Sequence, residues 1–164
     1  MTDHRNRTGQ SPVQARPAAV RKAVIAMYAA AALSAITILA VILNQETSGN
    51  LASRMTDAWP DYSANRIEEI ESITLTWLFT VGTVQAVGWL LLARTSRAGR
   101  KWVRPAAPAL LAAGIAITVV HFTEPFPALV TVTWALPHVA GLAAVAFLWR
   151  SESSAYLADR GATA

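Results

Sequence analysis

The residue with the greatest chemical capacity in this chain is a histidine deep within an apolar stretch. His138 follows Pro137 inside residues 127–149, which contain no Asp, Glu, Lys or Arg. An unperturbed imidazole titrates at about pH 6.5, so it can relay protons. A proline within a helix leaves the carbonyl four residues earlier, here that of Thr133, without its usual donor. A kink, a free carbonyl and an imidazole are therefore expected in one layer.

Gln85 is the second polar candidate, and it is expected at the same depth as His138. Counted from the ends of their apolar stretches, both residues lie roughly 16–18 Å inside, near the midplane of a bilayer. One hypothesis is a proton relay. The other is a neutral histidine that donates to a carbonyl or to Gln85. The second is favoured, because no charged residue accompanies either side chain in its stretch.

His121 and Glu124 form a weaker candidate, for a metal site. The His-x-x-Glu spacing places both side chains on one helix face, although Pro125 and Pro127 disfavour a helix there. A metal site normally has at least three protein ligands, and the sequence specifies no third one. Anchoring at the membrane interface is therefore preferred for both residues, and no metal or other cofactor is predicted.

Four apolar stretches must position these side chains. Residues 23–43, 73–93, 105–122 and 127–149 contain no charged side chain. Each is about long enough to cross a hydrocarbon core of roughly 30 Å at about 1.5 Å per residue. Only 15% of the 164 residues are charged, against roughly 25% in soluble domains. The sequence predicts an all-α membrane protein, with four transmembrane helices forming an antiparallel bundle within residues 21–150.

The basic residues are sorted to one side of these predicted helices. Of the fourteen Lys and Arg residues, only Arg54 and Arg66 lie between the first and second stretches. The positive-inside rule then places both termini in the cytoplasm. We expect the chain in the plasma membrane. Residues 1–20 are polar and predict a disordered cytoplasmic tail, and residues 151–164 a second cytoplasmic tail. Because the cations flank the spans, they indicate topology and not nucleic-acid binding.

The outer loop, residues 44–72, carries one amphipathic pattern. Leu51, Met55, Ala58 and Trp59 recur at helical spacing, and Pro60 follows them. We expect a short helix that lies on the outer leaflet. The alternative is a surface on which a partner docks.

Two helix starts are also predicted. Asn65 and Glu68 have the spacing of an N-cap and its N3 partner, so the second span is expected to begin near Arg66. Pro105 and Pro108 are expected in the first turn of the third span, where missing N–H groups are tolerated.

Each apolar stretch has one helical stripe of small or polar residues that is expected to face the other helices. Small residues let backbones approach, and polar side chains form bonds between helices. Packing is the favoured role, and Ser34, Thr37 and Thr118 join His138 and Gln85 as intramembrane polar candidates. The stripes consist of Ala30, Ser34 and Thr37; Gly82, Gln85 and Trp89; Gly114, Thr118 and His121; and Trp134, His138 and Gly141.

The segment between the second and third spans combines five cations with one tryptophan. Its core is Arg97-Ala98-Gly99-Arg100-Lys101-Trp102-Val103-Arg104. This run resembles an Arg/Lys-x-Gly-Arg-x-Trp-x-Arg turn between spans two and three of small four-helix membrane proteins of actinobacteria. The resemblance supports the topology and implies no activity. Charge beside an aromatic ring favours lipid headgroups, and the expected anchors are Arg97, Arg100, Lys101, Trp102 and Arg104.

The motifs of familiar enzymes are missing from the sequence. There is no cysteine, no His-Glu-x-x-His pair, no Gly-x-Ser-x-Gly elbow and no phosphate-binding glycine loop. We therefore expect a protein without catalytic activity that lies in the lipid bilayer. It would bind a membrane-protein partner or a second copy, or support an assembly. The alternative is a small proton-linked carrier or channel that uses His138 and Gln85.

Overall fold

The structure, a computed structural model, describes residues 17–48, 50–123, 126 and 128–160, which form helices and no strand. Four of the helices are long and two are short. In chain order they are α1 (Ala18–Ser48), α2 (Asn50–Ala58), α3 (Ala64–Arg97), α4 (Val103–His121), α5 (Ala128–Leu148) and α6 (Ser151–Arg160).

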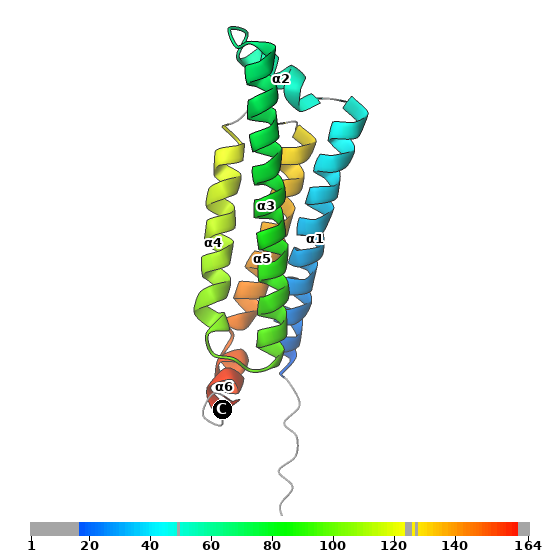
Figure 1. The fold of residues 1–164 in the computed structure, drawn as a ribbon. Helices are drawn as coiled ribbons and strands as arrows, with labels where there is room; N and C mark the ends of the chain where they lie inside the picture. Colours follow the sequence, from blue (N-terminus) through cyan, green and yellow to red (C-terminus); the bar gives the residue numbers. More distant parts are fainter. Residues whose placement is uncertain (1–16, 49, 124–125, 127, 161–164) are drawn as a thin grey trace, which may run out of the picture.

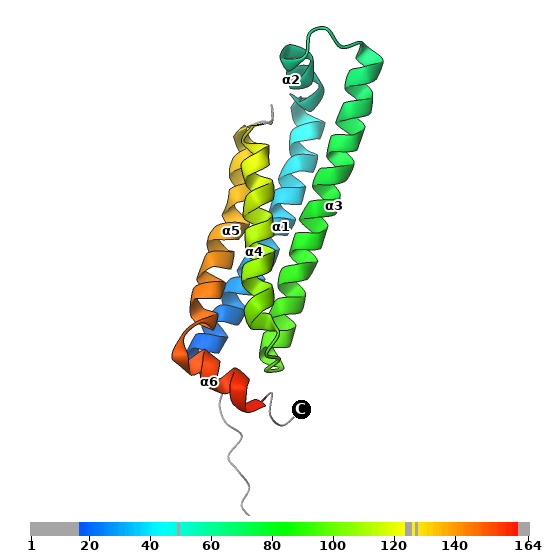
Figure 2. The same cartoon turned by 90° about the vertical axis from the view of Figure 1, so that its left-hand side faces the viewer.

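The four long helices form a bundle in which each one packs against two neighbours (Figure 1). Their order around the bundle is α1, α3, α4 and α5. The short α2 lies at the end where α1 finishes and α3 begins, and α6 lies at the opposite end (Figures 1 and 2). We refer to these as the α2 end and the α6 end.

The predicted helices of membrane-spanning length are confirmed. Each of the four long helices contains a stretch long and apolar enough to cross a bilayer. Many of their outward side chains are large and apolar: Ile25, Val84 and Val139 are 61%, 61% and 66% exposed. Lipid accommodates such a surface, whereas water does not. With 34 residues and a length of about 51 Å, α3 exceeds a hydrocarbon core of roughly 30 Å.

The four predicted inward-facing stripes are all buried in the bundle. Side chains three or four positions apart share one helix face, so a stripe of small and polar residues can face a neighbour throughout its length. Larger apolar side chains fill the space on either side of these stripes. Met27, Trp89 and Leu148 are fully buried towards the α6 end, and Val41, Leu78 and Trp134 form a separate cluster nearer the α2 end.

Both predicted tails contain helical residues. Helix α1 begins at Ala18, and Ala19 and Val20 are buried, so the helix includes the last three residues of the segment predicted to be disordered. Residues 1–16 of that segment lie outside the described part. In the C-terminal segment, α6 buries Ser153 and Tyr156, and the Ser153 hydroxyl donates to the Phe147 carbonyl at 2.8 Å. Residues 161–164 lie outside the described part.

The two predicted helix starts were wrong in detail. Ser63, not Asn65, is the N-cap of α3, and its hydroxyl accepts from the Arg66 N–H at 3.4 Å. Helix α4 begins at Val103, two residues before Pro105, so Pro108 lies beyond the first turn. Its missing N–H therefore deprives the Arg104 carbonyl of its usual helical donor.

The outer-loop helix is confirmed as α2, and two residues of its predicted apolar face contact protein. Leu51 and Met55 are 4% and 3% exposed, and they pack with Ile67 of α3. The long α3 continues past the bundle core and provides a protein surface for the apolar face of α2. Packing against α3 removes this apolar face from water, as contact with lipid would also do.

A glycine turn ends α3 and positions the cations of the next segment. Gly99 has a φ of 74°, a conformation that other residues seldom adopt. The Ala98 N–H donates to the Arg94 carbonyl and the Arg100 N–H to the Thr95 carbonyl, both at 3.1 Å. These bonds satisfy carbonyls that the helix end would leave free.

Candidate functional site

The two polar candidates midway along the bundle meet each other. Gln85 Nε2 on α3 lies 3.2 Å from His138 Nε2 on α5, and both side chains are buried. An amide nitrogen donates only, so the imidazole accepts at Nε2. This pairing corresponds to a neutral histidine with its proton on Nδ1. The predicted bond to Gln85 is present, but the histidine accepts it and does not donate it.

The carbonyl that Pro137 leaves without a helical donor receives one from another helix. Thr37 Oγ1 on α1 lies 2.8 Å from the Thr133 carbonyl and 2.9 Å from the Leu33 carbonyl in its own helix. The hydroxyl thus links α1 to the proline-containing turn of α5. The sequence predicted the free carbonyl and the burial of Thr37, but not that the two would meet.

Helix α4 closes the same layer with a glycine. A Cβ added to Gly114 would lie 2.4 Å from His138 Nε2 and 2.9 Å from Gln85 Nε2, distances that real Cβ atoms do not show. Only a residue without a side chain allows α4 to pass this close to the polar pair. We call Thr37, Gln85, Gly114 and His138, one residue from each long helix, the polar layer.

The polar layer has little free space beside it. The adjoining cavity has a volume of about 10 Å³, which is room for one water molecule at most. Ser34 lines this cavity with Gln85, and its hydroxyl donates to the Ala30 carbonyl at 2.9 Å. Thr118 is buried nearby on α4, and its hydroxyl has no hydrogen-bond partner in the described chain. The arrangement favours packing and fixed hydrogen bonds.

The metal hypothesis gains no support from the part of the chain that the structure describes. Glu124 lies outside the described residues, and among those described no group of three or more His, Cys, Asp or Glu residues could hold an ion. His121 is 2% exposed, so its side chain faces the interior of the bundle. Its ring lies 4.6 Å from Trp134, 4.9 Å from Phe126 and 5.1 Å from Trp77, measured between ring centroids.

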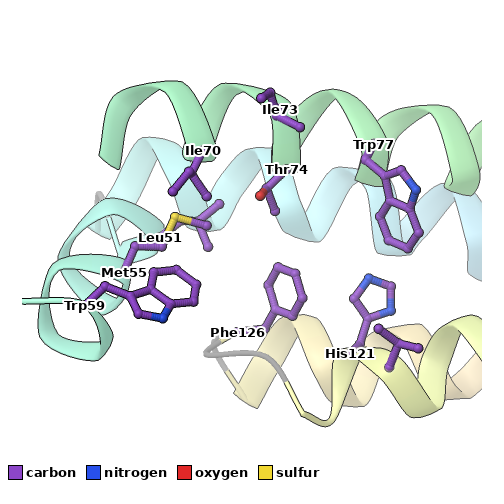
Figure 3. A pocket seen from close by; sticks show the side chains of 10 residues that line it. Leu51, Met55, Trp59, Ile70, Ile73, Thr74, Trp77, His121 and Phe126 are labelled. Atoms are coloured by element: carbon purple, nitrogen blue, oxygen red, sulfur yellow. The ribbon is translucent and has the colours of Figure 1, made fainter. Parts of the chain in front are cut away.

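A pocket of about 280 Å³ lies beside His121 at the α2 end (Figure 3). Its walls come from α2, α3, α4 and the segment before α5. The lining residues are Leu51, Met55 and Trp59; Ile70, Ile73, Thr74 and Trp77; Val120 and His121; and Phe126.

The predicted headgroup anchors gather at the α6 end, where two of them contact aromatic residues. Trp102 is 49% exposed, and Arg100 and Lys101 are exposed beside it. The Arg104 guanidinium lies 5.2 Å from the Trp149 ring centroid, and Arg97 Nη1 donates to the Tyr28 hydroxyl at 3.5 Å. Their role in binding lipid stays a prediction.

The sequence did not reveal the pocket, because its walls come from segments far apart in the chain. Trp77 lies one turn after Ile73 at the start of the second apolar stretch, and Phe126 lies between two prolines. Aromatic residues at the same ends of two spans were the available signal. The positions of these aromatic residues do not predict that α2 packs over Trp77 and Phe126.

Comparison of the chain with protein-family models, with characterised proteins and with solved structures found no match. The features that bear on function are therefore the polar layer, the pocket and the outer surface of the bundle.

Proposed function

We propose that this chain is a multi-pass protein of the cell membrane that binds a partner or supports an assembly and catalyses no reaction. The observation that carries the proposal is the closure of the polar layer. Gln85 bonds to His138 and Thr37 to the Thr133 carbonyl, each across helices, and the space beside them is about 10 Å³. In the described chain His138 Nδ1 is the buried nitrogen of this layer that has no hydrogen-bond partner. Interior side chains used in this way hold helices together, which leaves the outer surface for function.

The same closure weighs against the alternative, a proton-linked carrier or channel centred on His138 and Gln85. Transport requires polar groups or water that continue from the middle of the membrane towards both sides. Here His138 Nε2 meets Gln85, and Gly114 of α4 lies directly against both. This geometry supports a structural histidine more than a relay.

The proposed orientation is an antiparallel bundle with both termini in the cytoplasm and the α2 end outside. The distribution of Lys and Arg supports it, since Arg97, Arg100 and Lys101 lie near the α6 end. The path of the ribbon in Figure 1 supports the antiparallel arrangement, because consecutive long helices are joined at alternate ends of the bundle.

One outward face of α3 is suited to contact another membrane helix. Ser72, Thr76, Thr80 and Thr83 are exposed at spacings of three or four residues, and we call them the α3 hydroxyl face. Thr76 Oγ1 donates to the Ser72 carbonyl at 2.9 Å and Thr80 Oγ1 to the Thr76 carbonyl at 2.7 Å. Because their own helix satisfies these hydroxyls, lipid tolerates them. Small side chains at this spacing also let a second helix approach closely.

The outward face of α5 provides a matched contrast. Val132, Leu136, Val139 and Leu142 are exposed there, and all are bulky and apolar. Such a face packs well against lipid chains and offers no close approach to a helix backbone. We therefore assign the partner, either a helix of another membrane protein or a second copy of this chain, to the α3 hydroxyl face.

The test uses the absence of cysteine from the chain. A maleimide–benzophenone reagent is attached to Thr80→Cys, or to Val139→Cys as the control, in native membranes. After illumination, we expect one adduct of defined mass from Thr80→Cys, because the probe then lies at the partner contact. Val139→Cys should give none. No adduct from either variant, or the same adducts from both, would overturn the assignment.

A further inference from the structure

The His121 imidazole is buried without the hydrogen bonds that a buried polar group normally makes. It is 2% exposed, and neither ring nitrogen has a hydrogen-bond partner of normal geometry within the described chain. Its close neighbours are the rings of Trp77, Phe126 and Trp134. Buried polar groups without a partner are uncommon in native proteins, because desolvation without a compensating bond is unfavourable.

The same imidazole lies on the wall of the pocket at the α2 end. In Figure 3 the His121 ring lies opposite the Trp77 ring and next to the Phe126 ring. Met55 and Trp59 extend over the pocket from α2. Both ring nitrogens are covered by neighbouring side chains, so a molecule in the pocket reaches them only when one of these side chains moves.

The lining residues define the chemistry of a ligand. None of the residues that line the pocket is an Asp, Glu, Lys or Arg, so a charged ligand would be desolvated there without a counter-charge. The flat rings of Trp59, Trp77 and Phe126 suit a flat ring on the ligand. A neutral imidazole has one donor and one acceptor nitrogen, so it can bond to a carbonyl or a hydroxyl oxygen.

The size and place of the pocket restrict the ligand further. Its volume of about 280 Å³ lies just below the roughly 300–1,000 Å³ of typical small-molecule sites. That volume suits one ring system and not a whole phospholipid. The pocket lies at one end of the membrane-length helices, beside tryptophans of the kind that favour the headgroup level.

We infer that the α2-end pocket is a binding site for a neutral, lipid-soluble ring compound that carries a carbonyl or hydroxyl oxygen, with His121 as its hydrogen-bonding group. Such a ligand supplies what the imidazole lacks and fills the space between α2, α3 and α4. The inference goes beyond the proposed partner binding, because none of its residues belongs to the α3 hydroxyl face.

The experiment compares three probes of similar shape: 1-naphthol with a hydroxyl, 1,4-naphthoquinone with carbonyls, and naphthalene with no oxygen. Each is equilibrated with the protein in phosphatidylcholine nanodiscs and with empty nanodiscs. The excess bound to the protein-containing discs gives the affinity. We expect saturable binding of both oxygenated probes, about threefold to tenfold tighter than that of naphthalene, which is the effect of one hydrogen bond.

Three variants locate the binding. His121→Phe keeps an aromatic ring in the cluster, and it should reduce both oxygenated probes to the affinity of naphthalene while leaving naphthalene unchanged. Thr74→Trp fills the pocket and should weaken all three probes by about tenfold or more. Val139→Phe, on the outward face of α5, should change none of them.

Two results would overturn the inference. One is equal uptake by protein-containing and empty discs, which would mean that the probes only partition into lipid. The other is an unchanged preference for the oxygenated probes in His121→Phe. Because Thr74→Trp tests the pocket without touching the histidine, misfolding of one variant would not leave the result undecided. Either outcome leaves the crosslinking test of the α3 hydroxyl face unaffected.

Discussion

Thr37 and Pro137 illustrate how single residues compensate each other in this bundle. The proline removes a donor from the Thr133 carbonyl, and the hydroxyl of Thr37 supplies one from another helix at 2.8 Å. Within a membrane no water replaces a missing donor, so the compensation must come from the protein. The proline and the hydroxyl therefore act as a pair that joins α1 to α5.

The Thr37 hydroxyl should contribute more to the free energy of unfolding when Pro137 is present. Thr37→Val is expected to lower the free energy of unfolding by about 0.6–2 kcal/mol, because the Thr133 carbonyl then loses the hydrogen bond from α1. In a Pro137→Ala background the backbone N–H returns, and the loss should shrink. Unfolding by sodium dodecyl sulfate, followed by circular dichroism, measures both values. Equal losses in the two backgrounds would contradict the pairing.

Gln85 and His138 should show a measurable coupling. A double-mutant cycle of Gln85→Leu and His138→Phe is expected to give a coupling of about 0.6–1.7 kcal/mol, the range for hydrogen bonds between membrane helices. The bond between the two Nε2 atoms at 3.2 Å is the physical reason. Strictly additive losses in the same unfolding measurement would mean that the two side chains do not stabilise each other.

At the residue scale, the sequence predicted which side chains face inward, but not which residues they contact. The helical period places Ser34, Thr37 and Gln85 on inward faces whatever the neighbours are. The contact between Gln85 and His138 was one of two open alternatives, because it depends on the rotation of α3 relative to α5. The bond from Thr37 to the Thr133 carbonyl depends on the neighbour relation of α1 and α5, which no local pattern encodes.

At the scale of the helices, glycines allow neighbouring helices to approach closely. The side chains that these glycines face differ in how easily they can move. Gly114 faces the His138 ring and the Gln85 amide, which are buried and bonded to each other. Gly88 faces Leu110, a partly exposed side chain whose nearest end atom would lie 2.9 Å from a Cβ added to the glycine. A flexible side chain can move, whereas a bonded pair in a packed core cannot move without loss.

The two glycines should therefore respond differently to the same added methyl group. Gly114→Ala is expected to lower the free energy of unfolding by about 1–3 kcal/mol through overpacking. Gly88→Ala should have a clearly smaller effect, because Leu110 can adopt another rotamer. Both substitutions also raise helix propensity, so that contribution cancels in the comparison. If Gly88→Ala were as harmful as Gly114→Ala, the close approach of α4 to the polar layer would be in doubt.

The helix ends show where local patterns stop being sufficient. Helix α3 begins directly after Ser63, which is its N-cap. Asn65 has the spacing of an N-cap with Glu68, but it lies inside the helix. The apolar face of α2 was predicted from its spacing, but its burial against Ile67 required the extension of α3 beyond the bundle core. Amphipathic periodicity identifies a face to be buried and does not name the surface that buries it.

At the scale of the whole molecule, the bundle has an interior closed at its middle and an apolar exterior. The number of membrane-length helices could be predicted from the four charge-free stretches, because apolar stretches of this length are typical of membrane-spanning helices. The pocket did not follow from composition, since it requires α2, α3 and α4 to be placed together. Long-range placement of this kind is a property of the folded chain.

The proposed orientation predicts which engineered cysteines react in intact cells. Asp61→Cys, near the α2 end, should react with a membrane-impermeant maleimide. Lys101→Cys, near the α6 end, should react only after the cells are permeabilised. Both positions are exposed, so access to the reagent and not burial decides the result. The reverse pattern would mean that the α6 end faces outward, against the charge distribution.

The central claim is that the polar layer holds the bundle together and does not move protons, and its most direct test is a proton-flux measurement. The protein is reconstituted in liposomes with a pH gradient, and the decay of the gradient is followed with an internal pH-sensitive dye. We predict that the parent protein dissipates the gradient no faster than protein-free liposomes do. A faster decay with the parent protein that returns to the lipid rate in His138→Phe would contradict the account and identify His138 as a relay.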